Sequence, residues 1–249
     1  RVESVIENSL HSYLHKPCNT LYVLRQYALA ANLQEEFKLM TDELKIKSGS
    51  LRIGDVAPDF EARTTHGPIK LSDYRGRWLI FFSHPADFTP VCTTEFVALA
   101  RHQAEFEAMD CALLGLSVDS LYSHLAWVRA IEGRFGITIP FPIVEDPSMA
   151  VGRAFGMIDE NAADSAAMRT SFFIDPEGII RATTCYPHNV GRSVDEMVRM
   201  LAALQLAEEK NILTPEGWQP GDDVLEIPPL SAADIDREDD WFCHSVKTP

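Results

Sequence analysis

The sequence predicts an α/β fold, because short apolar segments alternate with helical segments along most of the chain. The apolar segments are bounded by turn residues, which is typical of buried strands. Between them, apolar residues recur every three or four positions, as on a helix that packs one face on a core. With 249 residues, of which 46% are hydrophobic, the chain is long enough to bury a substantial core.

Residues 1–50 have helical signals and none typical of strands. Apolar residues recur there every four positions, at Val2, Ile6, Leu10 and Leu14. Ser48, Gly49 and Ser50 are small and suit a flexible boundary. We expect a helical N-terminal extension over residues 1–50, followed by the main domain.

The main domain is predicted over residues 51–218. Its strands are predicted at residues 78–83, 112–118, 141–144, 170–174 and 179–184. Its helices are predicted as one segment following Cys92 as far as Met109 and as segments 121–134, 149–155 and 194–207. Asp175-Pro176-Glu177-Gly178 indicates a turn, and hence an antiparallel hairpin beside the parallel part of a mostly buried sheet.

Residues 219–249 differ in character and predict an extended C-terminal arm. The segment contains several prolines and an acidic run, followed by Trp241 and Phe242. Two adjacent aromatic side chains in a polar segment need an apolar surface, either on this chain or on a neighbouring one.

Composition limits the partners and the compartment. With 22 basic and 37 acidic residues the net charge is −15, so nucleic acid and anionic membrane surfaces are disfavoured by repulsion. No run of about 18 apolar residues is present, so no membrane span is predicted. Five scattered cysteines without a CxxC pair favour a reducing, cytoplasmic location. The chain begins with Arg1 rather than Met, and a targeting segment upstream of it would not be visible in this sequence.

The segment SHPADFTPVCTTEF, residues 83–96, predicts an abrupt change from strand to helix with Cys92 in the first helical turn. Unpaired N–H groups and the helix dipole favour a thiolate at this position. Pro85 and Pro90 make the approach rigid, and Thr89 is able to place a hydroxyl near the sulfur. The alternative is that Cys92 is a small buried hydrophobic residue. These residues alone leave both interpretations open.

A resemblance to a known family favours the interpretation of Cys92 as a reactive thiol. Pro85, Thr89 and Cys92 match the PxxxTxxC motif of the peroxiredoxins, and SHPADFTPVCTTE resembles the one-cysteine, or sixth, subfamily. The resemblance spans roughly residues 51–230. Further matching segments are residues 54–60, 117–120, 124–127, 141–143, 186–187, 191–192, 214–215 and 217–218.

This resemblance implies a thioredoxin-like fold and a thiol-dependent peroxidase. Cys92 would attack hydrogen peroxide or an alkyl hydroperoxide and become a sulfenic acid. Arg169 would lie against the sulfur, with Glu95 and Arg192 in the same network, and His84 would lie near the thiol. The alternatives are an ordinary surface salt bridge for Glu95 and Arg192 and a bystander role for His84. No cofactor is implied.

Cys243 follows Asp240-Trp241-Phe242, and this is similar to the C-terminal cysteine of archaeal-type two-cysteine relatives. It is the candidate resolving thiol, and a passive tail cysteine is the alternative. The resemblance also implies a thiol reductant, either thioredoxin-like or of low molecular weight, and a homodimer or a ring of dimers. Cys111 is expected to be buried and inert, whereas Cys185, near Arg192, is open to either interpretation.

Two further hypotheses receive less support. His11 and His15 lie about one helical turn apart near Cys18, but no fourth ligand is evident, so no metal site is predicted. A redox-sensing or chaperone-like interaction module on the same fold is the alternative function. The joint presence of the motif residues and Arg169 favours the peroxidase, because a scaffold does not need that combination.

Overall fold

The computed structural model describes residues 51–158, 164–231 and 241–248. They belong to one compact unit, Ser50–Pro249. The predicted N-terminal extension, with its histidine pair, lies outside the described residues.

Among the described helices, none combines the length and the apolar character that crossing a membrane would require.

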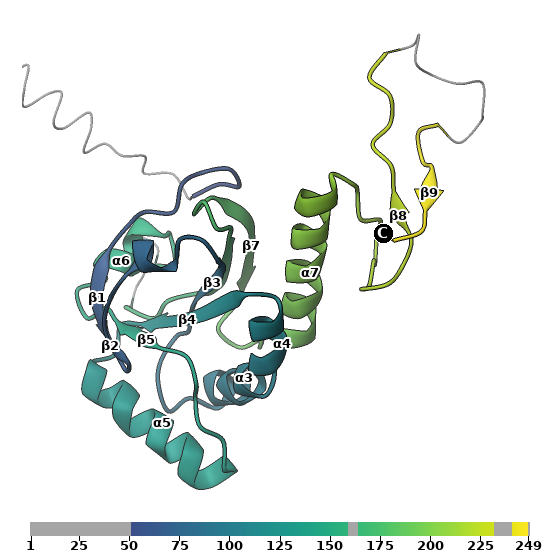
Figure 1. The fold of residues 1–249 in the computed structure, drawn as a ribbon. Coiled ribbons are helices and arrows are strands. Elements are labelled where there is room, and N and C mark those ends of the chain that lie inside the picture. The colour runs from purple at the N-terminus through teal and green to yellow at the C-terminus, as the bar shows by residue number, and fades with distance from the viewer. Residues whose placement is uncertain (1–50, 159–163, 232–240, 249) are drawn as a thin grey trace, which may run out of the picture. The chain divides into compact units, whose positions relative to one another are not determined.

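A seven-stranded mixed sheet forms the centre of this unit (Figure 1). Its strands are, in spatial order, β2 (Gly67–Lys70), β1 (Glu61–Thr64), β5 (Ile143–Glu145), β4 (Cys111–Ser117), β3 (Trp78–Ser83), β6 (Arg169–Ile174) and β7 (Ile180–Tyr186). Strands β3, β4 and β5 are parallel, whereas β6 is antiparallel to both β3 and β7. The five predicted strands and the hairpin between the last two are therefore confirmed.

The sequence analysis missed β1 and β2, which form an antiparallel hairpin at one edge of the sheet. Their residues are mostly polar or partly exposed, so neither strand carries the apolar run that marks the central strands. Pro68 in β2 is tolerated because β2 is an edge strand. Gly67 opens β2 with a φ of 106°, a conformation that favours glycine.

The described helices are η1 (Leu71–Tyr74), α3 (Pro90–Arg101), α4 (Gln103–Ala108), α5 (Leu121–Phe135), α6 (Ala150–Ala154) and α7 (Val194–Lys210). The single helix expected from Cys92 to Met109 is wrong, because His102 separates α3 from α4. The His102 ring donates from Nδ1 to the carbonyl of Ala98, at 2.8 Å. The short helix η1 was not predicted, whereas α5, α6 and α7 agree with prediction to within a few residues.

Two hydrophobic clusters cover the two faces of the sheet. Residues of α3, α4, α5 and α7 pack on the face that carries Ile80 and Phe82. Residues of α6 and η1 pack on the face that carries Leu79 and Phe81. All six residues of β3 are buried, which agrees with its uninterrupted apolar run and its central position.

An aromatic cluster holds α3 against the sheet. Phe96 of α3 lies between Phe82, Trp127 and Phe141, with ring centroids 5.7, 4.6 and 5.4 Å away. Because these rings come from β3, α5 and the segment before β5, the cluster fixes the first turns of α3 where β3 ends.

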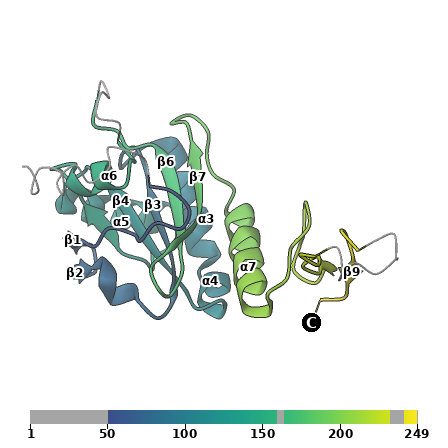
Figure 2. The same cartoon turned by 90° about the horizontal axis from the view of Figure 1, so that it is seen from above.

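The C-terminal segment packs on α7. Trp218 and Val224 form a small buried cluster with Ala203 of α7, and Val246 packs against it. Strands β8 (Val224–Leu225) and β9 (Ser245–Val246) form a two-stranded antiparallel sheet, and Figures 1 and 2 show α7 between them and the main sheet. The division at residue 219 stays a prediction.

Removing the Phe96 ring should destabilise the protein, because it leaves a cavity in the aromatic cluster. We expect Phe96→Ala to lower the free energy of unfolding by about 3–5 kcal/mol in urea denaturation. Tyr122→Ala is the matched control, since Tyr122 is 76% exposed, and it should change stability by less than about 0.5 kcal/mol. Equal losses in the two variants would contradict this account of the core.

Candidate active site

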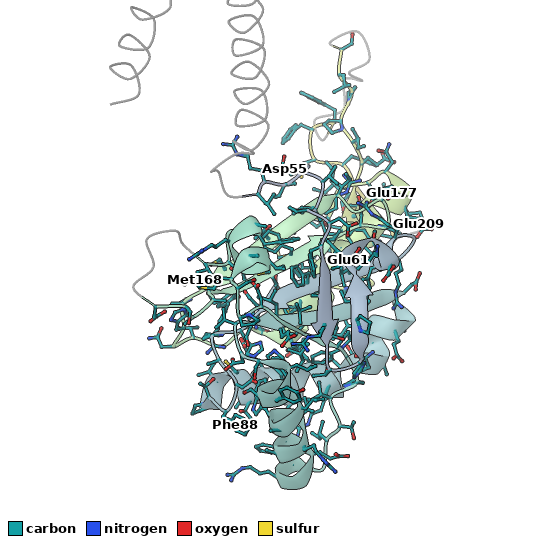
Figure 3. All side chains as sticks on the ribbon, turned by 90° about the vertical axis from the view of Figure 1, so that its left-hand side faces the viewer. Asp55, Glu61, Phe88, Met168, Glu177 and Glu209 are labelled. Atoms are coloured by element: carbon teal, nitrogen blue, oxygen red, sulfur yellow. The ribbon has the colours of Figure 1, made fainter. Side chains whose placement is uncertain are left out.

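Cys92 is the third residue of α3, and its side chain is completely buried. The chain leaves β3 at Ser83 and reaches α3 through a short loop that includes the buried Pro85. Phe88 in this loop has a left-handed φ of 57°, which is unusual for a bulky residue. Phe88 is also 59% exposed and lies at the periphery of the domain (Figure 3). The predicted change from strand to helix at the thiol is confirmed.

Arg169 brings a permanent cation to the sulfur. It is the first residue of β6, and its Nη1 lies 3.3 Å from the Sγ of Cys92. The same Nη1 donates to Oε2 of Glu95 at 2.8 Å. Nε and Nη2 both donate to the carbonyl of His188, at 3.1 and 2.7 Å. All three nitrogen atoms of the guanidinium therefore make hydrogen bonds, and the group has little freedom to turn away from the sulfur.

The carboxylate of Glu95 accepts hydrogen bonds from two arginines near Cys92. It lies one helical turn after Cys92 and accepts from Arg169 and from Nε, Nη2 and the backbone N–H of Arg192. Arg192 also donates to the hydroxyl of Ser171, at 3.0 Å. Glu95, Arg169 and Arg192 are all nearly inaccessible to solvent. The alternative of a surface salt bridge does not describe these three residues.

Gly191 permits the close approach of the Arg192 segment to α3. A Cβ atom at this position would meet the Cγ1 of Val91 at 3.3 Å, which is tighter than an ordinary contact. The backbone N–H of Arg192 lies 2.8 Å from Oε1 of Glu95. The small residue therefore lets the backbone and the guanidinium of Arg192 hold the same carboxylate.

The charges of this network favour an anion at the sulfur. Burial raises the pKa of Glu95, but the hydrogen bonds and charge of Arg192, with the charge of Arg169, lower it more, so the pKa lies below its ordinary value. Two guanidinium groups and one carboxylate leave one positive charge. In a buried site an uncompensated charge is costly, and a thiolate at Cys92 would compensate it.

Thr89 and His84 lie close to Cys92 along the chain, but their side chains bond elsewhere. The hydroxyl of Thr89 donates to the carbonyl of Ala86, at 2.9 Å, and makes no capping bond to α3. His84 is fully buried and packs its ring 4.8 Å from Phe96, one turn after Cys92. Burial lowers the pKa of His84 more than the hydrogen bond and charge of Asp87 raise it. His84 is therefore neutral at pH 7.

The other described cysteines occupy different environments. Cys111 is buried at the start of β4, and burial raises its pKa to about 12, as expected for an inert thiol. Cys185 pairs with Thr170 across β6 and β7, and the Thr170 hydroxyl lies 3.5 Å from its sulfur. Successive strand residues point to opposite faces, so Cys185 lies on the face away from Arg169. Cys243 is exposed in the C-terminal segment.

Several residues of the site escaped the sequence analysis. His188 contributes a backbone carbonyl, which no side-chain pattern reports. Ser171 lies inside an apolar strand and shows its role only through Arg192. Asp87 and His124 lay within the matched segments, yet no role was assigned to either. Their shared hydrogen bonds become apparent only in three dimensions.

The depressed pKa of Glu95 predicts a specific acid sensitivity. A carboxylate whose pKa is lower in the folded than in the unfolded state stabilises the fold above its unfolded pKa, about 4.3, and loses this effect as the pH falls through the folded pKa. Between about pH 5 and pH 3, the free energy of unfolding of Glu95→Gln should therefore fall less steeply than that of the parent. Urea denaturation over this range tests it, and identical slopes would contradict the assignment.

Comparison with known proteins identifies the family of this site. A profile of the AhpC/TSA family matches residues 53–183, and one of the C-terminal domain of 1-Cys peroxiredoxin matches residues 203–237. The chain is 45% identical over 201 residues to peroxiredoxin 2 of Thermoplasma acidophilum, covering 78% of this chain and 100% of that protein. It is 49% identical over 177 residues to a peroxiredoxin of Aquifex aeolicus, covering 71% and 80%.

Solved structures agree with this relationship. A yeast mitochondrial 1-Cys peroxiredoxin matches with a TM-score of 0.69 and 40% identity, covering 74% of this chain and 90% of that one. A mutant of peroxiredoxin 6 of Arenicola marina matches with a TM-score of 0.72 and 29% identity, covering 80% and 99%. The expected thioredoxin-like fold is thereby confirmed. The chain belongs to the peroxiredoxin family, as a thiol-dependent peroxidase related to its one-cysteine, or sixth, subfamily.

Proposed function

We propose that Cys92 is the peroxidatic nucleophile, and that it reduces hydrogen peroxide and alkyl hydroperoxides. The contact of 3.3 Å between Nη1 of Arg169 and the sulfur of Cys92 is the observation that carries this proposal. A guanidinium stays charged at any physiological pH, so it favours the thiolate continuously. The start of α3 adds the positive end of a helix dipole.

The reaction is a displacement at oxygen. The thiolate attacks one peroxide oxygen, the O–O bond breaks, and its electron pair goes to the other oxygen, which takes up a proton and leaves as water or an alcohol. Cys92 becomes a sulfenic acid and is oxidised by two electrons, while the peroxide is reduced. Arg169 stabilises the negative charge as it moves from sulfur to the departing oxygen. Thr89, with Pro85 shaping its loop, is the candidate to hold the peroxide.

Reduction of the sulfenic acid requires the buried sulfur of Cys92 to become accessible. Thr89, the N-cap of α3, makes no side-chain hydrogen bond to the helix. A start without that capping bond is easier to unwind, typically by about 1 kcal/mol. Opening of the first turn of α3 therefore gives a second thiol access to Cys92.

The second thiol in this proposal is Cys243, which is exposed and preceded by Trp241 and Phe242. The two aromatic rings contact each other and remain 38% and 66% exposed, so they are available to rest on a second copy of the chain in a homodimer or ring of dimers. A thioredoxin-like protein or a low-molecular-weight thiol would then reduce the product. The yeast 1-Cys peroxiredoxin with a similar structure is resolved through glutathione and thioredoxin systems. The proposed location is the cytoplasm.

The alternative of a redox-sensing or chaperone-like interaction module is not favoured. The relatives found by comparison are peroxiredoxins. Burial of Arg169 and Arg192 around one carboxylate would also be a costly arrangement for a scaffold that performs no chemistry.

Replacing Arg169 tests the role of its guanidinium. We expect Arg169→Lys to slow consumption of hydrogen peroxide by about a hundredfold in stopped-flow measurements, because an ammonium cannot hold the sulfur, Glu95 and His188 together. Arg199→Lys is the matched control, since Arg199 bonds Glu196 and the carbonyl of Trp218 away from Cys92. A Cys92→Ser protein that consumed peroxide as fast as the parent would remove the proposed function.

The resolving role of Cys243 has its own test. After one equivalent of peroxide, non-reducing gels and peptide mapping should show a disulfide between Cys92 and Cys243 that is absent from Cys243→Ser. Cys185→Ser is the control and should retain the bond, because Cys185 lies on the other face of the sheet. If the parent yields only unlinked, over-oxidised Cys92, Cys243 is a passive cysteine.

A further inference from the structure

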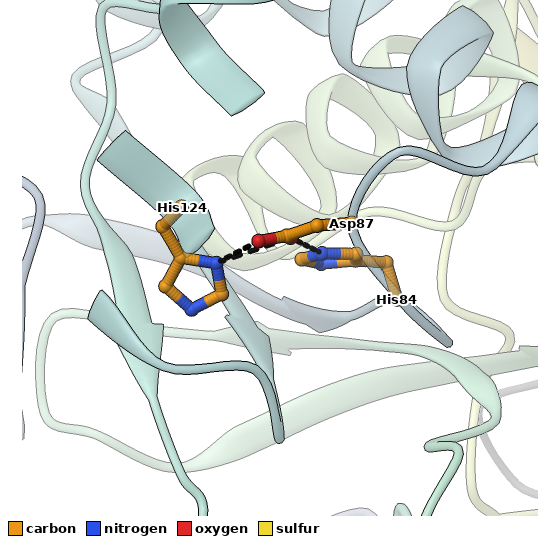
Figure 4. A group of neighbouring side chains, drawn as sticks. All are labelled: His84, Asp87 and His124. Atoms are coloured by element: carbon orange, nitrogen blue, oxygen red, sulfur yellow. Dashed lines mark hydrogen bonds and ion pairs between the residues drawn. The ribbon is translucent and has the colours of Figure 1, made fainter. Parts of the chain in front are cut away.

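His84, Asp87 and His124 form a buried cluster beside α3 that the reaction described above does not use (Figure 4). His84 follows β3, Asp87 lies in the loop before α3, and His124 lies in the first turn of α5. Nε2 of His84 lies 3.0 Å from Oδ1 of Asp87. Nδ1 of His124 lies 2.8 Å from Oδ2 of Asp87 and 3.1 Å from Oδ1. One carboxylate therefore joins two imidazole rings.

The partners of His124 determine its protonation. Its Nδ1 faces the carboxylate of Asp87, and its Nε2 lies 3.2 Å from the carbonyl oxygen of Val144. Burial raises the pKa of Asp87, but hydrogen bonds from His124 and His84 lower it far more, so this carboxylate is ionised. A carbonyl and a carboxylate only accept hydrogen bonds. His124 therefore donates from both nitrogens and is an imidazolium that neutralises Asp87.

The protonation of His84 follows from the same rule. Its Nε2 faces the ionised Asp87 and must donate, so the neutral ring carries its proton there and leaves a lone pair on Nδ1. Among the described residues, Nδ1 of His84 is one of few buried polar side-chain atoms without a hydrogen-bond partner. A buried acceptor is unfavourable when unpaired, so it requires an explanation.

We propose that His124 and Asp87 are positioning residues of the peroxidase site, which hold His84 in the tautomer that leaves Nδ1 free to accept a hydrogen bond. This inference rests on the proposed function, because a hydroperoxide O–H supplies the missing donor. The ring of His84 stacks on Trp127, with centroids 5.2 Å apart, and meets Phe96, so packing holds it in place. Asp87 is held as well, since its backbone N–H donates to Asp119.

A metal ion does not account for this cluster as well as hydrogen bonds do. The candidate ligand atoms all lie within 4.8 Å of one another. Ligands of a tetrahedral zinc ion at about 2.0–2.1 Å lie about 3.3 Å apart. The nitrogen–oxygen separations of 2.8 and 3.0 Å are shorter than this and match those of hydrogen bonds.

The tautomers are directly measurable. In the reduced parent protein labelled with ¹⁵N-histidine, long-range ¹H–¹⁵N correlations at about pH 7 should show both nitrogens of His124 protonated and His84 protonated on Nε2 alone. In Asp87→Asn the side-chain amide is able to donate to His84, so the single Nε2–H tautomer should be lost. A neutral His124, or a proton on Nδ1 of His84 in the parent, would overturn the inference.

Two rate measurements distinguish a positioning role of His124 from a role in core packing alone. We expect His124→Gln to reduce hydrogen peroxide about tenfold more slowly than the parent, while alkylation of Cys92 by iodoacetamide stays within about twofold, because the arginine network is intact. His102→Gln, the control, should change neither rate, since the His102 ring bonds Ala98 and Asp195. Loss of both rates in His124→Gln, or of neither, would contradict the proposal. If the parent itself consumed no peroxide, the proposed function would fail and this inference with it. If the parent consumes peroxide but the tautomers differ from those expected, this inference alone fails.

Discussion

A carboxylate buried between two guanidinium groups is the interaction on which the rest of this site depends. Glu95 satisfies donors from both Arg169 and Arg192, and each arginine also bonds the segment that carries the other, Arg169 through the carbonyl of His188 and Arg192 through the hydroxyl of Ser171. A buried charge is tolerated only when it is paired and hydrogen-bonded. Removing Glu95 would leave two cations unpaired, and removing either arginine would leave the others poorly held. The sulfur of Cys92 lies where the remaining positive charge is available.

The fold brings these residues together from distant parts of the chain. Cys92 and Glu95 come from the first turns of α3, Arg169 from β6 and Arg192 from the segment before α7. Residues 92 and 169 are 77 positions apart, so the contact exists only after β3 and β6 have paired. The aromatic rings around Phe96 fix the position of α3 relative to the sheet. The geometry of the thiol therefore depends on core packing as well as on charge.

Periodicity and motif predicted much of this arrangement, and the failures have physical causes. Strand β3 was evident because its six residues are all apolar or small and all buried. Strand β2 was missed because an edge strand that is partly exposed needs no apolar run, and a proline is tolerated in a strand mainly at such an edge. The division between α3 and α4 at His102 was not visible, since apolar residues keep their helical spacing across it.

For the site as well, some residues could be predicted from the sequence and others could not. Cys92, Arg169, Glu95 and Arg192 were identified from the family resemblance, and the structure brings them together as one network. The carbonyl of His188 could not be found, because backbone atoms carry no residue signature. His84 was expected to lie near the thiol, and its hydrogen bond to Asp87 assigns its proton to Nε2, which the sequence did not indicate. Although His84 and Asp87 are only three positions apart, the ring nitrogen that faces the carboxylate is defined only in the folded chain.

The central claim is that this network makes the sulfur of Cys92 reactive. The rate at which iodoacetamide alkylates Cys92 in the reduced protein at about pH 7, compared between the parent and Arg169→Lys with Cys92→Ser as the blank, measures this directly. The account predicts much faster alkylation in the parent, because the guanidinium of Arg169 lies 3.3 Å from the sulfur. Equal rates in the parent and in Arg169→Lys would contradict it.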